Sequence, residues 1–256
     1  MKKFCFTIDD NIRFMKECCR QGYPSIFNHS YIALLQRLHE MFDLKIQLNL
    51  FYKMNGFDLS QMNDCYAEEW KSCADWLKLS FHSELENVRP YQSSDYSEVY
   101  THCKAVQEQI LRFASKESLA KTTTLHYCQA TEEGVKALAD NGVRGLLGLF
   151  GTSERPGTSY SLDMDTAASI RNGATVKKNG ISFAAIDMVI NNYRLENILP
   201  TLKQFLSRDE VHVMIHEQFF YPDYKAYQPD FEKKLILVFE ALRNSGFESC
   251  FFEDMI

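Results

Sequence analysis

The sequence lacks the features that most directly indicate a nucleic-acid, membrane or zinc-knuckle protein. Its net charge is −6, so no excess of basic residues predicts binding to nucleic acid or to an anionic membrane. No apolar run approaches the roughly 18 uninterrupted residues that a membrane span requires. The eight cysteines form no Cys-x-x-Cys pair, which favours reduced thiols over a disulfide framework or a structural zinc site.

The chain also has no internal repeat, no low-complexity tract and no linker. With 256 residues, 45% of them hydrophobic, it is long enough for one large core, and we expect a single domain over residues 1–256. Asp9 and Asp10 interrupt the apolar stretch after Met-Lys-Lys, so we expect no signal peptide and a cytoplasmic protein. The oligomeric state stays open, with a homo-oligomer among the options.

Strand-like and helix-like segments alternate along the whole chain. Period-2 alternation or continuous apolar runs predict strands, and 3.6-residue periodicity predicts the helices between them. Such alternation favours an α/β fold with a mainly parallel sheet, closed or nearly closed into a distorted barrel of seven or eight β/α units. An open doubly wound sheet is the main alternative. The expected strands are 3–8, 44–52, 77–82, 122–127, 143–150, 181–190, 212–216 and 249–252, and the expected helices are 12–20, 30–42, 59–76, 97–115, 131–141, 196–206 and 230–245.

Two adjacent carboxylates, Asp9 and Asp10, end the first strand, where α/β proteins build their sites. Neighbouring carboxylates repel each other unless a cation lies beside them or their pKa values separate into acid and base roles. The alternative is that Asp10 or Asn11 caps the helix that follows. This stretch alone does not decide between the two.

Other strands also end in residues suited to a site. His82 and Glu86 are four residues apart, so a helical turn after Phe81 would present both on one side, as metal ligands often are. Together with Asp10 they form a three-ligand set for a divalent metal, zinc or else manganese, iron, cobalt, nickel or magnesium. His126, Tyr127 and His216 end later strands of the same expected barrel. Each histidine taken alone is more often a hydrogen-bonded structural residue.

Three motifs in order resemble those of the polysaccharide deacetylase family, the NodB-like carbohydrate esterases. Phe6-Thr7-Ile8-Asp9-Asp10 is similar to the family's Thr-Phe-Asp-Asp, and His82-Ser83-Glu84-Leu85-Glu86 to its His-Ser-x-x-His. Met214-Ile215-His216 is similar to its late Leu-x-His motif. The resemblance spans nearly the whole chain. It implies a distorted barrel that binds a divalent metal and hydrolyses an amide or ester of an acylated sugar or another small amide.

The resemblance also implies roles for individual residues. Asp9 would be the general base, Asp10 and His82 metal ligands, and His216 the general acid. Tyr127 lies where the family has a tyrosine whose backbone N–H stabilises the oxyanion. Asp187 is a candidate for orienting His216, or else a surface or capping residue.

Two departures from the family pattern affect these expectations. Glu86 replaces the second metal histidine, which would make the site more anionic. The family's Arg-x-x-Tyr motif, whose arginine steadies the base, appears only as Leu125-His126-Tyr127-Cys128, so His126 either replaces that arginine or is a further ligand.

Two other functions remain to be weighed. The altered motifs are compatible with a catalytically inactive barrel that binds a carbohydrate or a protein. A haloacid-dehalogenase-type phosphatase also begins with a strand ending in Asp, but it needs Asp-x-Asp, and here Asn11 follows Asp9 by two positions. We therefore expect a hydrolase with a small-molecule or carbohydrate substrate, without nucleic-acid or membrane partners.

Overall fold

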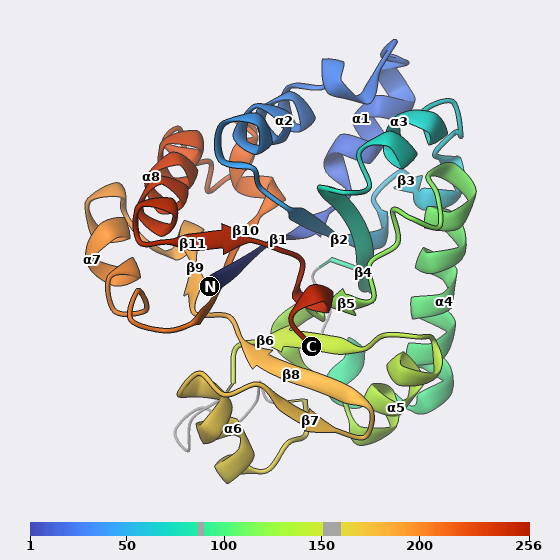
Figure 1. Ribbon diagram of the computed structural model, residues 1–256. Coiled ribbons are helices and arrows are strands. Elements are labelled where there is room, and N and C mark those ends of the chain that lie inside the picture. The colour runs from blue at the N-terminus through green and yellow to red at the C-terminus, as the bar shows by residue number, and fades with distance from the viewer. Residues whose placement is uncertain (87–89, 151–159) are drawn as a thin grey trace.

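The computed structural model describes residues 1–86, 90–150 and 160–256. Strands and helices alternate as expected, and the helices lie on the outside of the strands (Figure 1). The strands are β1 (Lys2–Asn11), β2 (Ile46–Met54), β3 (Phe57–Asp58), β4 (Leu77–Leu85), β5 (Thr122–Thr123), β6 (Gly145–Gly148), β7 (Val176–Lys178), β8 (Ile181–Ala185), β9 (Met188–Val189), β10 (Glu210–His216) and β11 (Phe247–Ser249). The α-helices are α1 (Arg13–Gln21), α2 (Ser30–Phe42), α3 (Ala67–Ser72), α4 (Tyr96–Phe113), α5 (Glu132–Asp140), α6 (Met164–Arg171), α7 (Ile198–Leu202) and α8 (Phe231–Asn244).

β1 is the central strand of the larger of two sheets. It pairs in parallel with β2, β10 and β11, and the sheet order is β3-β2-β1-β10-β9, with β4 also paired to β2. Its side chains are buried on both faces from Phe4 onward, as expected of a parallel strand covered by helices. Phe6 packs edge-on against Phe239 of α8, with ring centroids 4.9 Å apart.

The remaining strands form a second sheet in the order β5-β6-β8-β7. Between the two sheets, Leu79 of β4 exchanges backbone hydrogen bonds with Ser118 and Ala120, so the chain entering β5 runs beside β4. On the other side, the Ile186 N–H donates to Gly148 in the small sheet, whereas the next residue, Asp187, donates to His212 in the large sheet. The described strands therefore form an interrupted ring of two sheets, and the closed form of the expected barrel is not observed.

Several element boundaries differ from the prediction. The strand expected at 181–190 is two strands, because the chain passes from one sheet to the other at Ile186–Asp187. The helix expected at 59–76 is a 3-10 turn (Leu59–Gln61) followed by the short α3. The helix expected at 196–206 reduces to a 3-10 turn and α7.

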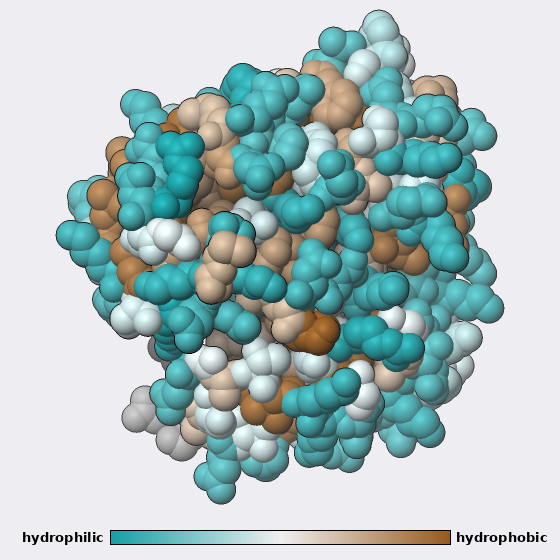
Figure 2. Space-filling view, in the orientation of Figure 1, coloured by the Kyte–Doolittle hydropathy of each residue, from teal (hydrophilic) through white to brown (hydrophobic). Residues whose placement is uncertain are grey.

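Two further features concern the cysteines and membrane-spanning segments. All eight cysteines are free. No helix within the described ranges is both long and apolar enough to cross a membrane. The face shown in Figure 2 is mainly hydrophilic, with scattered apolar areas.

Candidate functional site

The polar residues that follow the parallel strands line one open pocket of about 410 Å³. Each lies near the carboxyl end of its strand, as the sequence predicts. β1 contributes two carboxylates, β4 and the 3-10 turn after β5 contribute one histidine each, and β10 contributes another. Its polar lining residues include Asp9, Asp10, His82, Glu86, His126, Asn191, His216 and Gln218.

A bulge in β1 brings both adjacent carboxylates to this pocket. In a regular strand, consecutive side chains point to opposite faces. Here the register between β1 and β2 shifts between Ile8 and Asn11, and Asp10 adopts a left-handed conformation with φ of 62°. This conformation is unusual for a residue other than glycine and is typical of functional sites. Asp9 and Asp10 consequently line the same pocket.

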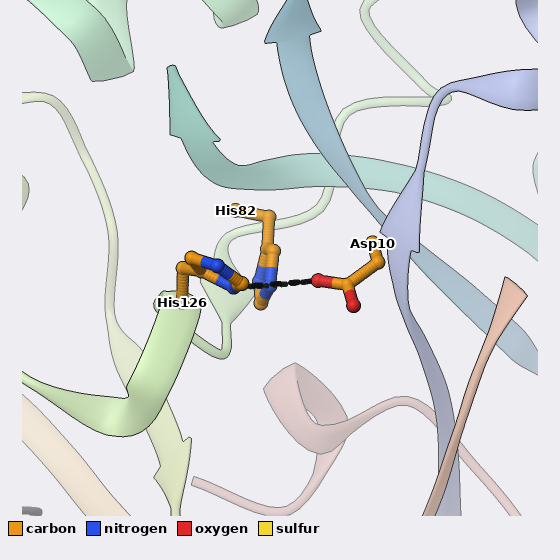
Figure 3. Close-up of side chains that lie close together, drawn as sticks. All are labelled: Asp10, His82 and His126. Carbon is orange, nitrogen blue, oxygen red and sulfur yellow. Dashed lines mark hydrogen bonds and ion pairs between the residues drawn. The ribbon is translucent and has the colours of Figure 1, made fainter. Parts of the chain in front are cut away.

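Asp10, His82 and His126 bring three potential ligand atoms together (Figure 3). Asp10 Oδ1 lies 3.0 Å from His82 Nε2 and 3.3 Å from His126 Nδ1. The two imidazole nitrogens are 3.2 Å apart. We call these three residues the Asp-His-His cluster. All three side chains are buried.

The geometry of the Asp-His-His cluster fits a divalent metal. With zinc–ligand bonds of about 2.0–2.1 Å, tetrahedral ligand atoms lie roughly 3.3–3.4 Å from one another, close to the separations in the cluster. His82 Nδ1 must donate to the carbonyl of Thr124, because a carbonyl only accepts. In the neutral ring this leaves a lone pair on Nε2, which faces Asp10. Such a hydrogen bond to the far ring nitrogen is how metal-binding histidines are usually oriented.

Charge is distributed unevenly within the cluster. Burial alone would raise the pKa of Asp10, but its contacts with the imidazoles of His126 and His82 outweigh it and hold that pKa well below its usual value. Burial lowers the pKa of His126 despite its contact with Asp10. Burial would lower the pKa of His82, but Asp9 and Asp10 outweigh it and raise that pKa. Metal binding requires an ionised carboxylate and neutral imidazoles, so it competes with protonation of His82.

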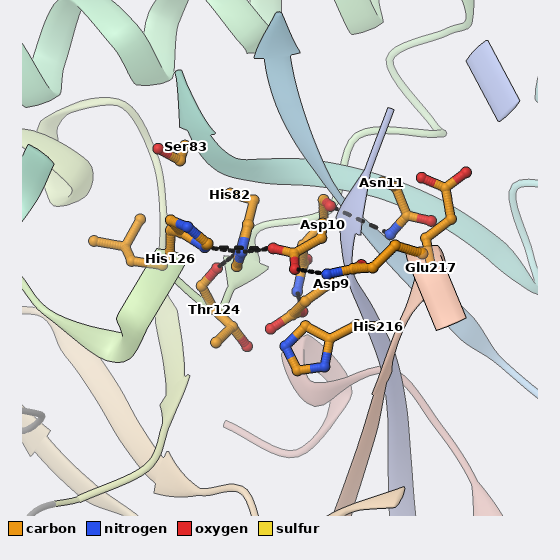
Figure 4. A network of polar contacts seen from close by, with 12 residues as sticks. Asp9, Asp10, Asn11, His82, Ser83, Thr124, His126, His216 and Glu217 are labelled. Atoms are coloured by element: carbon orange, nitrogen blue, oxygen red, sulfur yellow. Dashed lines mark hydrogen bonds and ion pairs between the residues drawn. The ribbon is translucent and has the colours of Figure 1, made fainter. Parts of the chain in front are cut away.

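Asp9 lies beside the cluster (Figure 4), and neutral side chains hold its carboxylate through hydrogen bonds. Its Oδ1 accepts a 2.6 Å hydrogen bond from Asn49 Nδ2. Asn49 Oδ1 accepts from Gln47 Nε2 at 2.8 Å, and Gln47 in turn bonds to Thr122 of β5. Burial raises the pKa of Asp9, although His82 and His216 oppose the rise. A fixed carboxylate with a raised pKa is suited to accepting a proton.

His216 is paired with Asn191, not with Asp187. Asn191 Oδ1 accepts the backbone N–H of His216 at 3.1 Å and lies 2.8 Å from His216 Nδ1. Nδ1 is therefore the donor, and Nε2 of the neutral ring is left as the second polar atom of this side chain. Asp187 instead binds Arg208 and the backbone N–H of His212. The contact with His216 that we expected from Asp187 is made by Asn191.

Glu86 lines the pocket but does not belong to the Asp-His-His cluster. The expected helical turn after Phe81 does not form, because β4 continues in extended conformation to Leu85. Four residues of a strand span about 13 Å, whereas the same spacing on a helix makes neighbours. The helical turn that was expected to place Glu86 beside His82 is therefore absent, and the third member of the cluster is His126.

Tyr127 lies at the pocket with a side chain 40% exposed and a left-handed backbone, φ 60°. The neighbouring Cys128 does not supply a nucleophile, because burial raises the pKa of its thiol to about 12.

Sequence reasoning missed Asn49, Asn191 and Gln218. Asn49 falls on the polar side of the alternating strand, where the sequence predicts exposure, and only the structure shows that it is buried. Gln218 Nε2 donates to Asp10 Oδ2 at 2.6 Å. No local pattern in the sequence distinguishes it or Asn191 from loop residues.

No protein-family model matches the sequence, and no curated protein matches it. Solved structures do. A family 4 carbohydrate esterase from Streptomyces lividans, in complex with acetate, superposes with a TM-score of 0.54 at 9% identity, over 97% of this chain and 91% of that one. The fold is similar to that of the family 4 carbohydrate esterases.

Two further structures extend this comparison. A family 4 carbohydrate esterase pseudoenzyme from Bacillus anthracis has a TM-score of 0.54 at 10% identity, over 99% of this chain. A 4-alpha-glucanotransferase from Thermococcus litoralis has a TM-score of 0.60 at 14% identity, also over 99% of this chain. The chain spans 64% of that pseudoenzyme and 40% of that glucanotransferase. At these identities the family 4 esterase likeness establishes the fold, and the side chains of this chain must carry the chemistry.

Proposed function

We propose that the protein is a metal-dependent hydrolase that removes an acyl group from an amide- or ester-bearing sugar or another small amide. The observation that carries this proposal is the Asp-His-His cluster, whose atoms lie 3.0–3.3 Å apart beside Asp9. Two histidines and one carboxylate leave open positions for water and substrate, as in catalytic zinc sites. The fold similarity to carbohydrate esterases supports the reaction class.

In this proposal Asp10, His82 and His126 hold the metal, and His126 takes the place that Glu86 was expected to fill. A bound divalent metal polarises the acyl carbonyl and makes water more acidic. Asp9 accepts the proton of the attacking water, and the Asn49 amide keeps its carboxylate in position. Asn49 therefore does the work that the related family assigns to an arginine.

In the same proposal His216 acts in its imidazolium form, and its Nε2–H gives the proton to the leaving group while Nδ1–H stays bonded to Asn191. Asn191 fixes its Nδ1 as a donor, so proton transfer must use Nε2. Tyr127 is retained as the residue whose backbone N–H stabilises the oxyanion. Asp187 is not part of the proposed machinery, because Arg208 and the His212 backbone engage its carboxylate.

The experiment combines metal analysis with an activity panel. Protein purified without added metal is analysed for metal content, and acetate release is measured from N-acetylated and O-acetylated sugars with zinc, manganese or cobalt. We expect one metal per chain and acetate release that His126→Ala abolishes and Glu86→Ala preserves. A protein that binds no divalent metal at micromolar concentration would contradict the proposal.

The similarity to a pseudoenzyme favours a second candidate, an inactive barrel that binds carbohydrate or protein. Metal binding with no hydrolysis of any substrate in the panel, together with saturable binding of an unmodified sugar, would favour this alternative. The intact pair of Asp9 and His216 beside the Asp-His-His cluster is the reason we rank it second.

A further inference from the structure

A second cavity of about 480 Å³ adjoins the catalytic pocket. The two cavities share four lining residues, so one ligand can extend from one into the other without leaving the protein surface. The cavity's other walls come from the β1–α1 junction and α1, from the end of β2, and from the segment after β10. The shared residues are Asp10, Glu86, Gln218 and Tyr224.

Three cations of α1 line this second cavity: Arg13, Lys16 and Arg20. Their spacing of three and four residues places them on one face of the helix. Burial, followed by the charges of Arg20 and Arg13, lowers the pKa of Lys16. The three positive charges are thus close enough to disfavour one another. This row of positive charge stands out in a chain whose net charge is −6.

Only one member of the row has an acidic partner among the described residues. Arg13 forms two hydrogen bonds with Asp223, at 2.7 and 2.8 Å. Lys16 donates to a neutral group, the carbonyl of Asn55 at 2.8 Å, and Arg20 forms no ion pair with any residue that the structure describes. Glu17, the carboxylate of α1 that also lines the cavity, lies 2.8 Å from His29 Nε2.

The cavity is therefore polarised along its length. Its end at the catalytic pocket carries Asp10 and Glu86, and burial together with Asp10 raises the pKa of Glu86. Arg20 lies seven residues beyond Arg13 along α1, which corresponds to about 10 Å of helix. The end remote from Asp10 thus presents Lys16 and Arg20 without carboxylate partners.

The junction of the two cavities also presents an unsatisfied acceptor. Gln218 donates its amide N–H to Asp10, but its Oε1 is buried and has no hydrogen-bond partner in the described chain. A buried amide oxygen without a donor is unfavourable, so a ligand hydroxyl or N–H at this position would satisfy it. The junction is therefore suited to a polar group that links the two ends of a longer ligand.

We propose that the second cavity binds an anionic group, phosphate or carboxylate, through Lys16 and Arg20. Resting on the proposed function, the substrate is then an acylated molecule that carries this anionic group at one end and presents its acyl group to the Asp-His-His cluster at the other. Guanidinium and ammonium groups bind such oxyanions through charge-assisted hydrogen bonds. Anion binding itself does not depend on hydrolysis.

The test is calorimetric titration of the full chain with inorganic phosphate and, separately, with acetate. The variant is Lys16→Gln/Arg20→Gln, and the control is Arg37→Gln, which removes an exposed arginine of α2 that pairs with Glu232 of α8. We expect the double variant to lose about tenfold or more in phosphate affinity, from lost charge-assisted bonds, and the control to bind as the unmodified chain does. Phosphate binding well above acetate binding assigns a phosphate group, and the reverse assigns a carboxylate.

Two results would overturn the proposal: equal phosphate and acetate affinities in the double variant and the unmodified chain, or no binding of either probe by the unmodified chain. Repeating the titration with His126→Ala separates this proposal from the hydrolase proposal. Phosphate binding that persists in His126→Ala locates the anion away from the cluster, even if no hydrolysis is found. Binding that disappears in this variant would place the anion at the metal and refute the second site.

Discussion

Two neighbouring aspartates at the end of β1 have opposite chemical environments. Asp10 contacts the imidazoles of both cluster histidines and accepts a hydrogen bond from Gln218, and these neighbours favour its ionised form. Asp9 is 1% exposed and accepts a hydrogen bond from the Asn49 side chain. The left-handed conformation at Asp10 makes this division possible, because it allows consecutive side chains to enter one pocket in different orientations.

This division predicts different results for the two Asp→Asn substitutions. Asp9→Asn should keep its metal and lower kcat by about 10²–10⁴-fold, the usual contribution of a general base. Asp10→Asn should lose metal affinity, because an amide is a weaker ligand than a carboxylate. Metal analysis and kcat measured on both variants check this. Near-normal kcat in Asp9→Asn would remove it from the role of base.

A second residue-scale prediction concerns Glu217, which is fully buried beside the site. Its carboxylate accepts the first backbone N–H groups of the α1 region, from Ile12, Arg13 and Phe14, and the Tyr221 hydroxyl. Burial nevertheless raises its pKa from 4.5 to about 7. Between these two pH values the folded chain binds more protons than the unfolded chain, so the Glu217 contribution to stability declines as pH rises through this window.

The difference corresponds to at most about 3 kcal/mol, at roughly 1.4 kcal/mol per pKa unit. Denaturant unfolding at pH 5 and pH 7 measures it. In Glu217→Gln this part of the pH dependence should disappear, whereas Glu232→Gln, at an exposed position on α8, should leave it unchanged. The same pH slope in Glu217→Gln and the unmodified chain would show that another group is responsible.

At the scale of elements, the two glycines of β6, Gly145 and Gly148, lie too close to neighbouring side chains to carry a Cβ. A Cβ added at Gly148 would lie 2.7 Å from Cε2 of Tyr160. Tyr160 is fully buried, and its hydroxyl bonds both to the Leu125 N–H and to the Leu147 carbonyl. Tyr160 therefore couples β6 to the segment that carries His126.

We expect Gly148→Ala to destabilise the protein by about 1–3 kcal/mol, as overpacking usually does, and to weaken metal binding through displacement of Leu125. Gly134→Ala is the matched control: it lies in α5, its nearest contact would be at 3.2 Å, and alanine favours a helix. Chemical denaturation and zinc titration of both variants provide the measurement. Equal effects of the two substitutions would contradict the proposed packing conflict.

Element-scale patterns were predictable from sequence where they depend on local periodicity. The alternation around Leu48 predicts β2, and the apolar stripe of residues 230–245 predicts α8, each with small boundary shifts. The switch between sheets at Ile186–Asp187 leaves no local trace, because both β8 and β9 are buried and apolar. The place of Glu86 outside the Asp-His-His cluster has a related reason. Whether β4 continues or turns after Phe81 depends on pairing with β2, not on residues 82–86.

At the scale of the whole molecule, the Asp-His-His cluster joins both sheets. Asp10 and His82 belong to the larger sheet, and His126 follows β5 of the smaller one. A metal bound to all three would therefore connect sheets that no regular ladder joins between β4 and β5 in the described residues. Its binding should stabilise the fold as a whole as well as the site.

We therefore expect zinc to raise Tm, with a stabilisation of about 2.7 kcal/mol when free metal is 100 times Kd. A chelator should reverse it. His126→Ala should abolish most of this shift, and Glu86→Ala should preserve it. A shift that depends on Glu86 and not on His126 would restore the ligand set expected from the His-Ser motif. Thermal unfolding with and without zinc decides between the two sets.

The position of β1 at the centre of the larger sheet has a consequence for biosynthesis. Among the described strands β1 is made before all others, whereas its partners β10 and β11 are made last. Until then the backbone groups of β1 that pair with these strands have no partner, and contacts between such distant segments form slowly. Asp9 and His216, opposite each other in the β1–β10 register, meet only at the end of this process. The proposed catalytic pair is therefore assembled only after the strands that follow β1 in the chain have been made, and until then β1 is exposed to association with other chains.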